Sequence, residues 1–167
     1  MMWFGMVLSM GGFQMQMVAR GILVYEMTDD ALITGLVGLG FAPSLLVVSL
    51  YGGVLGDRLE RRMLIQVSQA ANAALAGVVG VLLFTENLAW GHLFAVSVAQ
   101  GAMFALQMPA RQAAIPSLVG KDQLPNAFAL NAMAMSMMTL IAPALAGVLY
   151  EEIGPENVYV VVCVVML

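Results

Sequence analysis

The sequence predicts an all-α integral membrane protein, and three observations carry that prediction. Hydrophobic residues make up 62% of the 167 residues, and charged residues make up only 10%. The mean hydropathy is +0.94. A soluble domain is about 45–50% apolar and about 25% charged, so the excess apolar surface is expected to face lipid. Long apolar runs alternate with short charged joints, and such runs satisfy their backbone in lipid as helices.

Five apolar segments are long enough to cross the bilayer, and a sixth is partial. A helix needs about 20 residues to span about 30 Å of hydrocarbon. The first segment contains Gln14, Gln16 and Arg20, whereas the second and third carry no charge. The last segment is too short to span, so we expect the chain to end inside a helix. The single transmembrane domain, residues 1–167, then contains spans at residues 3–25, 31–55, 63–85, 88–107, 127–150 and, in part, 158–167.

The charges at the joints predict the orientation of the chain. The first, third and fifth joints hold acidic residues and no basic ones. Five of the six basic residues fall in the second and fourth joints, as Arg58, Arg61, Arg62, Arg111 and Lys121. The positive-inside rule places those two joints and the N-terminus in the cytoplasm. Aromatic residues are then expected in a belt at the outer boundary, formed by Tyr25, Trp90, Tyr150 and Tyr159.

The rare residue types exclude several classes of function. With a single cysteine, Cys163, and a single histidine, His92, the chain offers no internal disulfide and no metal cluster of the cysteine or histidine type. Six Lys and Arg residues are too few for a basic face that binds nucleic acid. We find no Ser–His–Asp set and no phosphate loop, so we expect neither enzymatic activity nor a cofactor.

The second joint orders its charges more strictly than topology requires. Residues 53–62 read Gly-Val-Leu-Gly-Asp-Arg-Leu-Glu-Arg-Arg. This resembles the signature between helices 2 and 3 of the major facilitator superfamily (MFS) of secondary transporters. That signature is glycine, three residues, aspartate, a basic residue, any residue, glycine and two basic residues. Glu60 replaces the second glycine, and the matching residues are Gly53, Asp57, Arg58, Arg61 and Arg62.

The resemblance extends over most of the chain. Residues 19–43 and 108–131 are similar to the bacterial branch of the superfamily that includes the enterobactin exporter. This implies the N-terminal six-helix half of an MFS transporter in the bacterial inner membrane, with a truncated sixth helix and a missing C-terminal half as its partner. In the family the loop controls conformation, with Asp57 facing a helix N-terminus of the other half, which is favourable by about 0.3–1 kcal/mol. The alternative is an anchor with local ion pairs only.

Polar residues within the spans are candidates for a substrate site. Gln16 and Arg20 lie one turn apart on the first span. Gln100, Gln107 and Arg111 form a stripe on the fourth. Because MFS helices 1 and 4 line the central cavity, the resemblance implies a substrate cavity containing Gln16, Arg20, Gln100 and Gln107. Two alternatives stay open: Arg20 reaches the headgroups, and the glutamines only join helices, at about 0.6 kcal/mol each.

The fifth span carries a further resemblance. Residues 142–147, Ala-Pro-Ala-Leu-Ala-Gly, resemble the antiporter motif of MFS drug exporters, with Pro143 and Gly147 matching. The alternative is a packing seam of small residues. Taken together, the resemblances imply a lipid-embedded transporter that exports a small amphipathic substrate by alternating access. The rival interpretations are a membrane scaffold without transport activity and an inactive truncated product.

Overall fold

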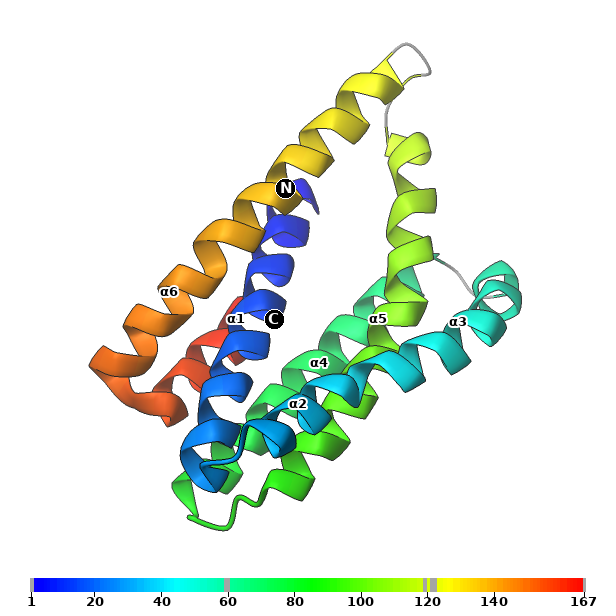
Figure 1. The fold of residues 1–167 in the computed structure, drawn as a ribbon. Helices are drawn as coiled ribbons and strands as arrows, with labels where there is room; N and C mark the ends of the chain where they lie inside the picture. The colour runs from blue at the N-terminus through cyan, green and yellow to red at the C-terminus, as the bar shows by residue number, and fades with distance from the viewer. Residues whose placement is uncertain (1, 59–60, 119, 121–122, 167) are drawn as a thin grey trace.

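The computed structural model describes residues 2–58, 61–118, 120 and 123–166. Within these residues the long regular elements are all α-helices (Figure 1). In chain order they are α1 (Met2–Thr28), α2 (Ala31–Leu39), α3 (Phe41–Arg58), α4 (Arg61–Phe84), α5 (Trp90–Leu118) and α6 (Leu124–Met166). The fold class expected from composition is therefore present in the described part of the chain.

The predicted span at residues 31–55 is interrupted once, between α2 and α3. Pro43 has no N–H to donate to the carbonyl four residues back, at Leu39, which is the last residue of α2. The Ser44 hydroxyl donates to the Phe41 carbonyl oxygen at 3.0 Å within the first turn of α3. At the other end of α2, the Asp30 side chain accepts from the Leu32 N–H at 2.7 Å and caps the helix.

A second break divides α6 between the two segments predicted at residues 127–150 and 158–167. Gly154 has φ 81° and ψ 160°, a conformation that glycine adopts at little cost. Pro155 follows at the start of the next helical segment, where a missing N–H costs nothing. The chain reverses here, and its last segment returns beside α1 (Figure 1).

The helices pack as two pairs that α4 joins. α1 packs mainly against α6 and α3 mainly against α5, while α4 contacts both α5 and α6. The returning end of α6 lies on the small residues of α4: a methyl group on Gly80 would be 3.6 Å from Tyr159 Cβ, and the Cys163 thiol donates to the Ala73 carbonyl at 3.5 Å. The end of α5 and the beginning of α6 lie near each other at the end of the bundle where α1 begins, and the two helices lie farther apart away from that end (Figure 1).

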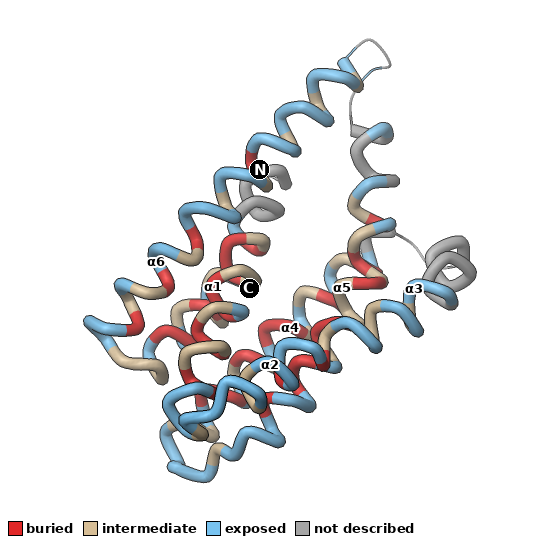
Figure 2. Tube along the Cα trace, viewed as in Figure 1, coloured by how far each residue is buried: buried red, intermediate tan, exposed pale blue. Residues whose placement is uncertain are grey.

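The exposure pattern is that of a membrane protein. Many large apolar side chains are exposed, among them Leu50 at 79% and Leu140 at 76%. Exposed positions lie along the outer sides of the helices (Figure 2). Among the described residues, four helices have the length and composition to cross a membrane, over Ala31–Leu50, Met63–Phe84, Trp90–Gln112 and Leu124–Val165. Since water would penalise this outer surface, the chain is a multi-pass membrane protein.

Two details of the prediction need correction. Tyr159, expected in the outer aromatic belt, is 1% exposed and lies in the interior of the bundle. Helix α5 continues past Gln107 as far as Leu118, so Arg111 lies on a helix instead of in a joint. Pro109 and Pro116 do not end α5, although each removes one backbone hydrogen bond from it.

Candidate functional site

A buried polar layer joins α1, α5 and α6 inside the bundle. Arg20 of α1 is 4% exposed, and its Nη1 donates to Oε1 of Gln100 on α5. Tyr159 of α6 lies close enough to Arg20 to interact with it electrostatically. The Arg20 side chain therefore turns into the bundle, and its place in a substrate cavity stays a prediction.

Several polar atoms of this layer have no hydrogen-bond partner among the described residues. They are Nε2 and Oε1 of Gln16, Oγ of Ser97, Nε2 of Gln100 and the hydroxyl of Tyr159. Gln16 and Gln100 are each 1% exposed, and Ser97 is fully buried. An unsatisfied buried polar group costs about 1–3 kcal/mol. A fold that retains several of them is typical of a functional interior rather than of a core selected only for stability.

An aromatic layer lies next to the polar one. Phe13 of α1 and Phe104 of α5 stack, with ring centroids 5.3 Å apart and planes at 24°. Phe41, at the start of α3, contacts both rings at 6.0 and 5.6 Å between centroids. On α1, Phe13 lies nearer than Arg20 to the end of the bundle where α1 begins. On α5, which runs the other way, Phe104 lies nearer to that end than Gln100. The aromatic layer therefore lies between the buried polar layer and the pocket that Phe13 and Phe104 line.

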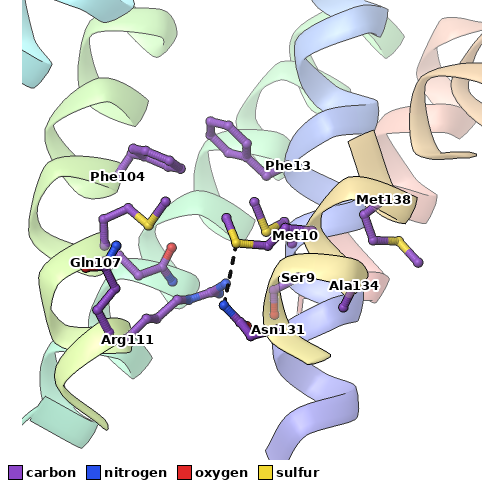
Figure 3. Close-up of a pocket in the computed structure, with 12 residues that line it drawn as sticks. Ser9, Met10, Phe13, Phe104, Gln107, Arg111, Asn131, Ala134 and Met138 are labelled. Atoms are coloured by element: carbon purple, nitrogen blue, oxygen red, sulfur yellow. Dashed lines mark hydrogen bonds between the residues drawn. The ribbon is translucent and has the colours of Figure 1, made fainter. Parts of the chain in front are cut away.

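Beyond the aromatic layer is a pocket between α1, α5 and α6 (Figure 3). Phe13 and Phe104 line it, so the stacked rings form one wall. The other lining residues are amides, thioethers, a hydroxyl, a methyl group and one guanidinium: Ser9, Met10, Gln107, Met108, Arg111, Gln112, Asn131, Ala134, Met135 and Met138. The pocket therefore combines a flexible apolar surface with hydrogen-bonding groups, as small-molecule sites do.

The polar groups of the pocket come from facing helices. Figure 3 shows the Arg111 guanidinium extending from α5 toward Asn131 on α6. The Asn131 amide donates to the Met135 sulfur at 3.6 Å, a weak hydrogen bond that leaves its carbonyl oxygen for another donor. Ser9 accepts from Gln69 Nε2, which ties α1 to α4 at this level. A smaller adjoining pocket is lined by Gln69 and Asn72 of α4 as well.

The four residues predicted for a substrate cavity are all buried, at 1% exposed for Gln16, 4% for Arg20, 1% for Gln100 and 8% for Gln107. Only Gln107 lines the pocket. Arg20 and Gln100 are hydrogen-bonded to each other in the buried polar layer. A role in binding substrate stays a prediction for each of them.

The predicted gating motif is placed only in its backbone. Gly53, Asp57 and Arg58 lie in the last turns of α3, and Arg61 and Arg62 open α4. Their side chains lie outside the described residues, so the gating role stays a prediction.

The antiporter-like motif lies on α6. A methyl group on Gly147 would meet nothing within 4 Å. The two alanines that replace glycines are the packed positions, with Ala142 at 2% exposed and Ala146 fully buried. Close packing at residues 142–147 is thus achieved without Gly147, and the motif's role in antiport stays a prediction.

Sequence reasoning missed Ser9, Gln69, Asn72 and Asn131. The signal was present, because Gln66, Ser68, Gln69 and Asn72 are polar residues in the middle of a long apolar span. They were passed over because the predicted cavity was limited to the first and fourth spans and to their glutamines and arginines. Within the part of the chain that the structure describes, no group of three or more His, Cys, Asp or Glu side chains is placed to hold a metal ion.

Comparison with known proteins extends over the whole chain. The MFS_3 family model, described as transmembrane secretion effector, matches residues 1–167. The staphyloferrin A transporter of Staphylococcus aureus is 22% identical over 121 residues, which are 72% of this chain and 30% of that protein. The enterobactin exporter EntS of Citrobacter koseri is 28% identical over 139 residues, 82% of this chain and 33% of that protein.

The chain thus spans about a third of the length of the curated relatives it matches. No solved structure matches it. The match to the family model leaves out no part of the chain, and both relatives are MFS transporters. The apolar outer surface, the polar interior and these matches agree, and the chain belongs to the MFS_3 family of the major facilitator superfamily.

Proposed function

We propose that this chain is the N-terminal half of a secondary transporter that exports a small amphipathic molecule by alternating access. The observation that carries the proposal is the pocket between α1, α5 and α6, which joins thioethers and aromatic rings to amides and a guanidinium inside a lipid-facing bundle. MFS transporters bind substrate near the middle of the membrane, at the interface between their two repeats or halves.

The export direction is supported by the relative whose printed name is enterobactin exporter. The proposal requires a second half, since the cavity of one half has no opposite wall. The length of the relatives, about three times the matched region, supports a longer transporter from which this chain comes. The gating loop, residues 53–62, would then close against that second half, with Asp57 at a helix N-terminus.

Transport is tested in bacterial cells that lack their main exporters. The chain is expressed together with a C-terminal six-helix half, and the efflux of a fluorescent amphiphile is followed. Energised cells are expected to retain less of the dye than cells that carry an empty vector, and dissipating the membrane potential and proton gradient should remove the difference. Equal retention in the two strains would point to a membrane scaffold or an inactive product.

The gating loop has its own variant in the same assay. Asp57→Asn keeps the shape of the side chain but removes the charge that the helix N-terminus of the second half would stabilise, by about 0.3–1 kcal/mol. We expect efflux to fall several-fold with unchanged expression. Glu151→Gln neutralises an exposed acid on α6 and serves as the matched control, with wild-type efflux expected. Wild-type efflux by Asp57→Asn would contradict the gating role.

The orientation in the bacterial inner membrane is part of the proposal and has a separate test. Cys163 is the only cysteine, so Cys163→Ser gives a background without thiols. A cysteine introduced at position 60 is expected to react with a membrane-impermeant maleimide only after the cells are opened, whereas one at position 86 should react in intact cells. The reverse pattern would place the arginine-rich joint outside and overturn the assigned orientation.

A further inference from the structure

The described residues that line the pocket carry one sign of charge. Arg111 is the cationic residue among the described lining residues, and no acidic residue is among them. A guanidinium has five N–H donors in a planar fork, more than a single protein partner occupies. In surroundings of low dielectric constant, a cation of this kind favours an anionic ligand and disfavours a cationic one much more strongly than it would in water.

Amide groups support the same end of the pocket. Gln107 lies one turn before Arg111 on α5, and Asn131 faces it from α6 (Figure 3). The NH₂ group of Gln107 and the second N–H of Asn131, whose first donates to Met135, are hydrogen-bond donors that suit the oxygens of a carboxylate or a sulfonate. Charge-assisted hydrogen bonds of this type are about twice as strong as neutral ones.

The aromatic side of the pocket, formed by Phe13 and Phe104, suits a flat apolar group. Phe13 and Phe104 stack at an interplanar angle of 24°, and both belong to the lining. Met10, Met135 and Met138 complete the apolar side, and their flexible, polarisable thioethers adapt to aromatic ligands of different shape. A ligand that has its anion at Arg111 can therefore hold an aromatic ring against these residues.

We infer that the pocket selects anionic amphiphiles, with a carboxylate or sulfonate on Arg111 and a planar ring beside Phe13 and Phe104. This inference rests on the proposed function, because it names the substrate class of the same site. The inference narrows the proposed substrate class, because the proposed function alone allows cationic, neutral and anionic amphiphiles.

The test measures binding by the chain in lipid nanodiscs. The probes are 2-naphthoate, 2-naphthylmethylammonium and 2-naphthylmethanol, which share one ring system and differ in charge. Binding is measured by equilibrium dialysis. The amount of probe taken up by nanodiscs without protein is subtracted, which corrects for partition into the lipid. We expect 2-naphthoate to bind at least about 10-fold more tightly than the ammonium probe, because hydrogen bonds to charged groups have that strength.

Two substitutions at Arg111 and one control locate the source of selectivity. Arg111→Gln should weaken 2-naphthoate binding about 10-fold or more and leave the neutral probe within about 2-fold. Arg111→Lys should retain the preference for the anion. Gln123→Glu changes the net charge by the same amount at an exposed position outside the pocket, and it should leave all three affinities unchanged.

The failures of the two proposals are distinguishable. Equal affinity for the three probes, or an anion preference that survives Arg111→Gln, would overturn the anionic class and leave transport of amphiphiles intact. Selective binding of 2-naphthoate together with absent efflux in cells would overturn the transport proposal and leave the binding site standing.

Discussion

Gly101→Ala is expected to lower the apparent melting temperature of the chain in detergent by roughly 6–12 °C, or about 3 kcal/mol. A methyl group at this position of α5 would lie 2.2 Å from Ser44 Oγ and 2.4 Å from the Phe41 carbonyl oxygen. The second contact is with backbone at the start of α3, where the chain has already been interrupted after Leu39. Because the methyl group would meet backbone atoms, a side-chain rotation cannot remove the clash. The substitution should therefore push α3 and α5 apart. Thermal unfolding followed by size-exclusion chromatography measures the shift.

Gly35→Ala is the matched control for that substitution. Gly35 lies within α2 and is exposed, and a methyl group there would meet nothing within 4 Å. Alanine is favoured over glycine in a helix by about 1 kcal/mol, so this variant should melt at or slightly above the wild-type temperature. Adding Ser44→Ala to Gly101→Ala removes the side-chain contact but not the one with the Phe41 carbonyl, and should restore only part of the loss. Equal melting of the two alanine variants would show that α3 and α5 are not in close contact.

Gly101 also shows where prediction from the sequence stops. The helical class and the lipid-facing surface follow from composition, since both depend on totals rather than on particular contacts. The break at Gly40 could not be predicted from Pro43 alone, because Pro43 disfavours an uninterrupted helix through Leu39 but Pro109 and Pro116 leave α5 unbroken. That Gly101 and not Gly147 is the tightly packed glycine is decided by which helices meet, and hydropathy carries no information on that.

The site was predicted in part for the same reason. Periodicity placed Gln16 with Arg20 and Gln100 with Gln107, because spacing along one helix fixes which side chains share a face. It could not place Tyr159 against Arg20, since that contact depends on the chain reversing at Gly154. Nor could it bring Asn131 to the pocket, because Asn131 lies on a different helix whose facing side is set by packing against α1.

Gln100→Leu is expected to destabilise the chain by about 3 kcal/mol, and the reason is the charge that it leaves behind. Gln100 Oε1 accepts from Arg20 Nη1 in the buried layer, where Arg20 is only 4% exposed. Without that acceptor the guanidinium keeps its charge and loses its partner. Arg20→Met removes the charge itself but leaves Gln100 unpaired, at a cost of about 1–3 kcal/mol. Melting temperatures of the purified variants in one detergent measure both losses.

The double variant Arg20→Met with Gln100→Leu distinguishes a coupled pair from two separate losses. Replacing both partners by apolar groups of similar size is often close to neutral, so the double variant should be more stable than Gln100→Leu alone. Gln14→Leu is the control on the same helix, because Gln14 donates to Thr139 across an exposed contact of 3.3 Å and its loss should cost less than about 0.5 kcal/mol. If the two single losses simply add, Arg20 does not depend on Gln100, and its charge must be stabilised elsewhere in the bundle. If they couple as expected, the fold keeps a buried cation that a hydrophobic pair would replace without loss of stability, which supports its retention for function rather than for folding.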